Sequence, residues 1–362
     1  MSRESLSVAI LTSADDVADA RLHRLSNALI KGGCTVDICA LGVKENAPQG
    51  ARFWKAPGKK NFSGRILRDI SIPLFARGDV WVIVAPDLLP TAWVIGKLRG
   101  KKIVADVHED YVQLLKDRAW AKGWVGLVAK VVAHLATRLA AASDMTSVAD
   151  KHVPPFTAKK RVVVRNLPDQ SLLTMSSDLS PTPTAIYIGD VRKSRGLFTM
   201  LDAAELAPTW KFEIIGNLSA ADADAVLQWK SRNPETASRV NFHGRLAPRD
   251  AWKFAGDAWV GLTLLESTPA FVEAVPSKLY EYMSAGLATI STPLPRCVSL
   301  ISESKGGSIA ASAEEVAHSL NQWSSHPDEI RAIRQQAKQW ADSNLDSERE
   351  YGAFVSGIKE LF

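Results

Sequence analysis

The chain of 362 residues contains few cysteines, and their number and spacing exclude several kinds of protein. Cys34, Cys39 and Cys297 are odd in number and lack the spacing of metal ligands. They cannot supply the dense disulfide framework of a small secreted domain, so we interpret them as small apolar residues of a reduced, cytoplasmic protein. The first residues, 1–5, are mixed in charge and do not have the pattern of a secretory signal.

Long apolar runs are also absent, since no stretch reaches the ~20 consecutive apolar residues of a membrane span. Hydrophobic residues make up 46% of the chain and charged residues 23%, which is an ordinary globular balance. A chain of this length is expected to form two domains, each with its own core.

The two halves of the chain differ in charge. Residues 1–170 have a balance of +10, whereas the remainder has a balance of −5. A basic first half joined to an acidic second half indicates that the first half meets an anionic partner.

Short runs rich in Val and Ile alternate with amphipathic stretches through both halves, which predicts parallel sheets buried on both faces. We expect an α/β fold with two doubly wound, Rossmann-like domains, at 1–168 and 185–340, with ligands at the carboxyl ends of the strands. A Pro- and Ser-rich linker is predicted at 169–184. Strands are predicted at 6–11, 35–41, 80–85, 102–106, 145–147, 161–164, 185–188, 211–215, 240–242, 258–264 and 288–291, and the first helix at 16–31.

The most informative segment is 273–286, in which two carboxylates stand eight positions apart. Pro276 and Ser277 fit the first turn and cap of a helix that continues to residue 285 and contains Glu281. Glu273 would lie on the loop before it. Because the free N–H groups of a helix N-terminus attract anions, the segment fits a ligand with hydroxyls at one end and phosphate at the other. The spacing of the two glutamates alone fits a solvated helix cap with a surface charge as well as it fits a ligand site.

The segment also resembles the E-x7-E signature of retaining GT-B glycosyltransferases of the family 4-like, or "group 1", type. This family includes many bacterial cell-surface polysaccharide and glycolipid enzymes. The resemblance implies that Glu273 binds hydroxyls of the donor sugar and Glu281 those of the ribose. N–H groups around Ser277, Lys278 and Leu279 would help to hold the diphosphate. It further implies that a final helix, 341–362, returns to the first domain.

A basic turn follows the predicted strand 185–188, where Gly189 precedes Arg192, Lys193 and Arg195. Guanidinium groups at this position can bind a diphosphate bidentately and stabilise its charge. The turn is similar to the family's donor-phosphate segment, which assigns the role to Arg192 and Arg195, while Lys193 also fits a solvated turn. Without an Asp-x-Asp cluster at such a site, these residues rather than a metal ion are expected to neutralise the leaving group.

His108 follows the predicted strand 102–106 and stands in a segment that resembles the family's Asp-x-His-Glu stretch. The resemblance implies that His108 contacts the donor sugar near the reaction centre. A neutral imidazole there can hydrogen bond to a hydroxyl or accept charge from the leaving group. Glu109 fits a cap of the next helix best, while orienting the ring of His108 and binding the acceptor are the alternatives.

The first loop departs from the family pattern, because no glycine stands between Leu11 and Gly32. Hydroxyls of Thr12 and Ser13 are expected to substitute for it, while Asp19 and Arg21 match the family's Asp-x-Arg position. In the second half, turns that resemble those bracketing the nucleotide base carry Gly216 and His243.

The stretch 119–142 combines an apolar band with a stripe of Lys130, His134 and Arg138. Together with basic residues at 59–68 and 116–122, it fits either docking on an anionic membrane or a helix with its basic face in water. The charge asymmetry favours docking, and nucleic acid is not expected because no recognition motif accompanies the charge.

The resemblance predicts a retaining, metal-independent transferase that needs no cofactor. It would move a sugar from a UDP- or GDP-sugar to a lipid-linked or saccharide acceptor, in the cytoplasm or on the inner face of the plasma membrane. Two alternatives remain open from the residues: an isomerase such as a sugar-nucleotide 2-epimerase, and a protein that binds sugar nucleotides without turnover.

Overall fold

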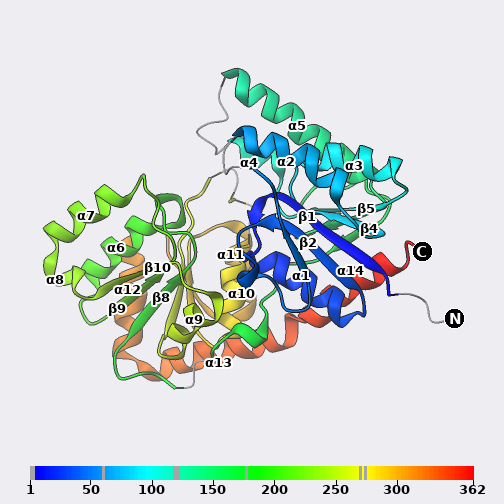
Figure 1. Cartoon of the computed structure of the whole chain (residues 1–362). Helices are drawn as coiled ribbons and strands as arrows, with labels where there is room; N and C mark the ends of the chain where they lie inside the picture. Colours follow the sequence, from blue (N-terminus) through cyan, green and yellow to red (C-terminus); the bar gives the residue numbers. More distant parts are fainter. Residues whose placement is uncertain (1–4, 59–61, 117–122, 176–177, 269–270, 273–274) are drawn as a thin grey trace. The chain divides into compact units, whose positions relative to one another are not determined.

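The computed structural model describes the chain except for residues 1–4, 59–61, 117–122, 176–177, 269–270 and 273–274. The chain forms two compact units (Figure 1). The first unit consists of residues 1–166 and 347–362, and the second of residues 167–346. The first unit therefore includes the final helix of the chain, and the segment predicted as a linker begins the second unit.

The first unit is built on a parallel sheet of seven strands in the order β3-β2-β1-β4-β5-β6-β7. Its inner strands are almost fully buried on both faces, as their Val and Ile content predicts. The strands are β1 (Ser7–Asp16), β2 (Thr35–Leu41), β3 (Arg52–Lys55), β4 (Val80–Ile83), β5 (Lys102–Val107), β6 (Met145–Val148) and β7 (Arg161–Val163).

Helices cover both faces of this sheet. Leucines of α1 and aromatic residues of α14 belong to the core on one face, and residues of α3 and α5 to the core on the other, where α2 packs beside α3. Their bounds are α1 (Ala20–Lys31), η1 (Lys44–Asn46), α2 (Phe62–Phe75), α3 (Leu89–Leu98), α4 (Tyr111–Lys116), α5 (Gly123–Ala142) and α14 (Ser347–Lys359).

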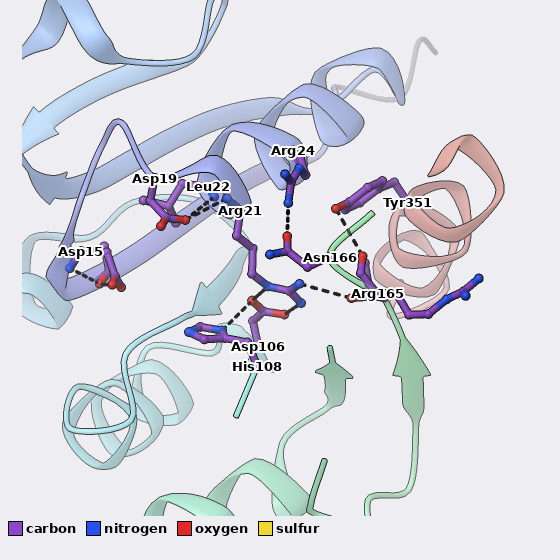
Figure 2. Close-up of polar contacts among 12 residues, drawn as sticks. Asp15, Asp19, Arg21, Leu22, Arg24, Asp106, His108, Arg165, Asn166 and Tyr351 are labelled. Atoms are coloured by element: carbon purple, nitrogen blue, oxygen red, sulfur yellow. Dashed lines mark hydrogen bonds and ion pairs between the residues drawn. The ribbon is translucent and has the colours of Figure 1, made fainter. Parts of the chain in front are cut away.

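Within the first unit, polar contacts connect residues 165–166, where the chain leaves this unit, with α14, where the chain returns to it. The backbone N–H and the Nε of Arg165 donate to Glu350 of α14 over 2.8 and 2.5 Å. Arg24 of α1 donates to the side chain of Asn166, and the Tyr351 hydroxyl donates to the Arg165 carbonyl (Figure 2). The final helix is thus an integral part of the first unit.

The second unit has a parallel sheet of six strands in the order β10-β9-β8-β11-β12-β13. Helices α6, α7 and α12 contribute to the core on one face, and α9, α10, α11 and α13 to the cores on the other side. The elements are η2 (Gln170–Leu172), β8 (Thr184–Ile188), η3 (Lys193–Arg195), α6 (Leu197–Leu206), β9 (Lys211–Ile215), α7 (Ala223–Arg232), α8 (Pro234–Ala237), β10 (Val240–Gly244), α9 (Pro248–Lys253), η4 (Phe254–Gly256), β11 (Val260–Thr263), α10 (Ser277–Ser284), β12 (Ala288–Ser291), α11 (Pro295–Ser304), β13 (Gly307–Ile309), α12 (Ala313–Ser325) and α13 (Pro327–Asn344).

The predicted fold of two doubly wound parallel-sheet domains is confirmed, with two local corrections. The first helix begins at Ala20 rather than at residue 16, because the Asp19 side chain caps it by accepting the N–H groups of Arg21 and Leu22. Ser277 is the first residue of α10 and not its cap, which is Pro276. Strands β3 and β13 are not predicted, since three or four residues at a sheet edge give little pattern.

Candidate functional site

The two predicted motifs of the second unit follow neighbouring strands. Strand β8 pairs with β9 on one side and with β11 on the other, so the chain order reverses between β8 and β11. Such a reversal in an open parallel sheet leaves room for a ligand at the carboxyl ends of the two strands. The basic turn 189–196 follows β8, and the segment that leads to α10 follows β11.

Glycines let the backbones of these turns approach one another. Gly216, which follows β9, has φ +151°, and a Cβ there would lie 1.6 Å from the Gly189 carbonyl oxygen. Gly196 has φ +84°, and a Cβ there would lie 2.2 Å from the carbonyl oxygen of Leu264. Only glycine fits this close packing at a positive φ. The backbones of the turns that follow β8, β9 and β11 are therefore in close contact.

The arginines of the basic turn differ in their partners. Arg192 donates from Nη2 to Asp190 over 2.6 Å, whereas the Arg195 guanidinium lies 4.7 Å from the centre of the Phe271 ring. The Nε atoms of both arginines are buried and have no hydrogen-bond partner among the residues that the structure describes. Lys193 donates its backbone N–H to Asp222. Unsatisfied, buried guanidinium nitrogens suit an incoming anion.

Helix α10 is fixed to strand β8, because the Tyr282 hydroxyl accepts the N–H of Ile188 over 3.0 Å inside the core. Glu281 is almost fully buried and pairs with Lys278 over 2.7 Å. Sequence reasoning did not predict this pair, although the i, i+3 spacing allows it. The N–H of Leu279 already donates to the Pro276 carbonyl, which leaves the N–H groups of Ser277 and Lys278 as the candidates for binding an anion.

Glu273 lies outside the described residues. Its position relative to Glu281 stays a prediction of the sequence.

His108 of the first unit follows β5 and lies beside the buried ion pair of Arg21 and Asp106 (Figure 2). Its Nδ1 lies 3.6 Å from Asp106, which accepts two hydrogen bonds of 2.6 Å from Arg21. Burial opposes the charged form of His108, but the Asp106 carboxylate outweighs it and raises the pKa of the imidazole. Against the effect of burial, the Arg21 guanidinium lowers the pKa of Asp106 far below its ordinary value. The sequence marks its members only separately, Arg21 in the Asp-x-Arg match and Asp106 with His108 in the Asp-x-His-Glu match, and does not predict that Arg21 and Asp106 form a pair.

Thr12 and Ser13 lie inside β1, just after Leu11, where the pairing of β1 with β2 becomes irregular, and both are buried. The Thr12 hydroxyl donates to Asp15 over 2.6 Å and accepts the N–H groups of Ala14 and Asp15, so it stabilises the irregular part of the strand. Within the described part of the chain, the Ser13 hydroxyl has no hydrogen-bond partner.

His243 in β10 pairs with the buried side chain of Glu213, and its ring lies 4.4 Å from that of Phe254. Lys211 and Asn241 also donate to Glu213. These contacts give His243 a structural role in the sheet.

A family comparison covers the part of the chain that carries both motifs. Residues 193–351 match the family model described as "Glycosyl transferase-like". The match begins in the basic turn, includes all of α10 and ends in α14. This segment is similar to glycosyl transferases. The predicted group 1 glycosyltransferase resemblance is thereby confirmed.

Solved structures of GT-B glycosyltransferases match the whole chain. Sucrose-phosphate synthase from Thermosynechococcus elongatus has a TM-score of 0.76 at 12% identity, over 99% of each chain. HepE from Anabaena in complex with UDP-glucose has a TM-score of 0.72 at 13% identity, over 98% of this chain and 100% of its own. WaaG, a glycosyltransferase involved in lipopolysaccharide biosynthesis, has a TM-score of 0.65 at 14% identity, over 97% and 99%. The sequence has no significant match among curated proteins. These matches show that the chain has the GT-B fold.

Proposed function

We propose that the protein transfers a sugar from a nucleotide diphosphate sugar to an acceptor hydroxyl. The observation that carries this proposal is the β8–β11 edge of the second unit, where two arginines with unsatisfied buried nitrogens follow a glycine-lined turn. Such an edge suits the diphosphate of the donor. The glycosyl transferase-like match of the same segment supports it.

The proposed role of each residue follows from the chemistry of its side chain or backbone. Arg195 and Arg192 hold the diphosphate and stabilise its charge as it leaves, with the N–H groups of Ser277 and Lys278. Glu281 accepts hydrogen bonds from the ribose hydroxyls, and its carboxylate then binds both Lys278 and the ligand. By resemblance, Glu273 binds the donor sugar and His108 contacts it near the reaction centre.

Retention of configuration and metal-independent turnover are further parts of the proposal. Retention rests on the resemblance of 273–281 to the retaining enzymes. Metal independence rests on the arginines, which supply the positive charge that a cation would otherwise bring to the leaving group.

The acceptor is proposed to be lipid-linked or saccharide, in cell-surface polysaccharide or glycolipid synthesis. The GT-B relative WaaG is involved in lipopolysaccharide biosynthesis, which supports that class. We place the protein in the cytoplasm, with an anionic membrane surface as a partner of its basic first half. HepE binds UDP-glucose in its solved complex, which makes a UDP-sugar the first donor to examine.

The test is thermal unfolding with UDP-, GDP-, ADP- and TDP-sugars in the presence of a chelator. A ligand at 100 times its dissociation constant adds ~2.7 kcal/mol to the free energy of unfolding, so one nucleotide class should raise the melting temperature. No shift with any of them would contradict a donor site at the β8–β11 edge.

With the donor known, Glu273→Ala should abolish nucleotide release. Conversion of the donor alone without nucleotide release would indicate the isomerase, and binding without any turnover the non-catalytic protein.

A further inference from the structure

Helix α5 buries small apolar residues and exposes large ones, which is the reverse of an ordinary surface helix. Its buried residues are Gly126, Ala133, Ala136 and Ala140, and the three alanines belong to the core on one face of the sheet of the first unit. Most of its bulky residues are exposed, with Trp124 at 79% and Leu127 at 66%. An ordinary surface helix buries its large apolar residues, because this contributes ~1.5–3 kcal/mol for each side chain. The outer side of α5 is therefore suited to contact something apolar.

The apolar surface continues over the neighbouring helices. Helix α3 packs between α2 and α5 on the same face of the sheet (Figure 1). All three helices expose large apolar side chains on their outer sides. We call the set the apolar outer face: Ile66, Leu67, Ile70, Leu74 and Phe75 of α2, Val94 and Leu98 of α3, and Trp124, Leu127, Val128, Val131 and Leu135 of α5. So many exposed large apolar side chains on three helices that pack side by side mark an interaction site.

Charge beside this face is of one sign. Lys130, His134 and Arg138 recur every four residues along α5, so they form a stripe that borders its exposed apolar residues, and all three are exposed. Helix α5 contains no acidic residue, and within the bounds of α2, α3 and α5 the only one is Asp69, which is half-buried.

We propose that the apolar outer face docks into the headgroup and outer acyl region of an anionic bilayer. An apolar stripe bordered by basic residues, with a tryptophan at one end, is the pattern of a helix that lies in the membrane interface. Anionic lipid attracts the basic border, with each basic residue contributing to the electrostatic part of binding. A second copy of the chain fits this face less well, because a symmetric pairing would bring like-charged borders together.

The mode of docking follows from how α5 is packed. By length and composition α5 could cross a membrane, with a mean hydropathy of 1.5, but its alanines belong to the core of the first unit. The helix is therefore held parallel to the sheet and contacts the bilayer along its side. This inference adds apolar insertion to the charge-based partner proposed above, and it does not depend on the identity of the donor.

The primary test is flotation of the full chain with vesicles of phosphatidylglycerol and phosphatidylcholine in equal parts. We expect binding that persists in part at about 1 M NaCl, where the Debye length is ~3 Å and charge attraction is screened. The triple variant Leu127→Gln, Val131→Gln and Leu135→Gln should lower the partition coefficient at least about tenfold. Glutamine keeps helix propensity, and the replaced side chains are exposed, so the melting temperature should be unchanged. Leu227→Gln, at an exposed position of α7, is the matched control and should bind like the unchanged protein.

A second measurement reports insertion directly. The three native cysteines are buried, so Leu127→Cys and the control Leu227→Cys can each be labelled with an environment-sensitive dye. Vesicles should shift the emission of the dye at 127 to the blue and leave that at 227 unchanged. Equal binding by the triple variant, or complete release at high salt without a dye shift, would overturn apolar insertion. Concentration-dependent dimers that the triple variant abolishes, without vesicle binding, would assign the face to a second copy.

Discussion

The first six strands have the same order in the sheets of both units, but the residues at the carboxyl ends of the strands differ. In the second unit, the edge between β8 and β11 is lined by Gly189, Gly196 and Gly216, and buried guanidinium nitrogens there have no partner among the described residues. In the first unit, the order reverses between β1 and β4, and the ends of these strands carry hydroxyls and paired charges instead.

The difference separates two ways of preparing a site. The glycine-lined turns pack closely against each other and leave the buried Nε atoms of Arg192 and Arg195 without a partner among the described residues. In the first unit, Arg21 pairs with Asp106, and the same carboxylate lies 3.6 Å from Nδ1 of His108 and raises the pKa of the imidazole. We therefore interpret the second unit as the part that binds the anion and the first as the part that presents a fixed polar group.

The largest expected effect is the loss of the glycine-lined edge. Gly216→Ala would place a Cβ 1.6 Å from the Gly189 carbonyl oxygen, so two backbone turns would have to separate. We expect the free energy of unfolding to fall by about 4 kcal/mol or more, measured by urea denaturation. Gly33→Ala is the control, because Gly33 has φ +79° but nothing within 4 Å of its Cβ position, and should cost only ~1–2 kcal/mol. Similar losses in the two variants would show that φ alone, and not the close approach of the turns, requires Gly216.

Breaking the buried pair of the first unit should have the next largest effect. Asp106→Asn leaves the Arg21 guanidinium buried without its carboxylate, which should cost about 3 kcal/mol. It also removes the charge that raises the pKa of His108, so the imidazole should titrate at lower pH in the variant. The raised pKa means that protonated His108 stabilises the fold at low pH, and that this stabilisation is lost as the pH rises through the folded-state pKa.

An NMR titration of the His108 ring, assigned with a His108→Gln variant, measures the second effect. An unchanged midpoint in Asp106→Asn would contradict control of His108 by Asp106, even if the fold is destabilised as expected.

The fold and the place of the candidate site could be predicted from the sequence because their signals are local. Buried parallel strands are short runs rich in apolar residues, as in β2 and β9, each of which also contains one carboxylate and whose predicted and observed bounds agree. The basic turn and α10 follow such strands directly, so the topology brings them to one edge of the sheet.

The partners of the site residues could not be predicted, because they come from distant parts of the chain. Arg21 and Asp106 are 85 residues apart, and the Tyr282 hydroxyl meets an N–H that is 94 residues away. The exposure of the bulky residues of α5 could not be predicted either. Periodicity identifies an apolar stripe on a helix but not which side of the helix packs against the sheet.

The two arginines of the basic turn should differ in their effect on donor binding. Arg195→Ala should weaken the donor nucleotide by about 2 kcal/mol, or roughly 30-fold in dissociation constant, because it removes a guanidinium that has no described carboxylate partner. Arg192→Ala should cost less, about 1 kcal/mol, since Asp190 competes for its guanidinium. Calorimetric titration of both variants with the nucleotide found in the melting assay tests this. Equal losses would show that the Asp190 pair does not persist when the ligand is bound.

The smallest expected effect concerns Asp69 of α2, at the edge of the first unit. Burial, and then the nearby charge of Asp87, raise the pKa of Asp69 from 3.8 to about 6. The folded protein thus binds more protons than the unfolded chain between these values, so the free energy of unfolding falls as the pH rises through this window. Asp69→Asn removes that penalty and should stabilise the protein by about 1 kcal/mol or less above pH ~6, with no gain below pH ~4, because solvent screens a half-buried group. Urea denaturation of both proteins across this range measures the difference. A gain that is the same at both ends would mean that the amide side chain packs better than the carboxyl, and that the carboxylates of this edge carry no penalty when ionised.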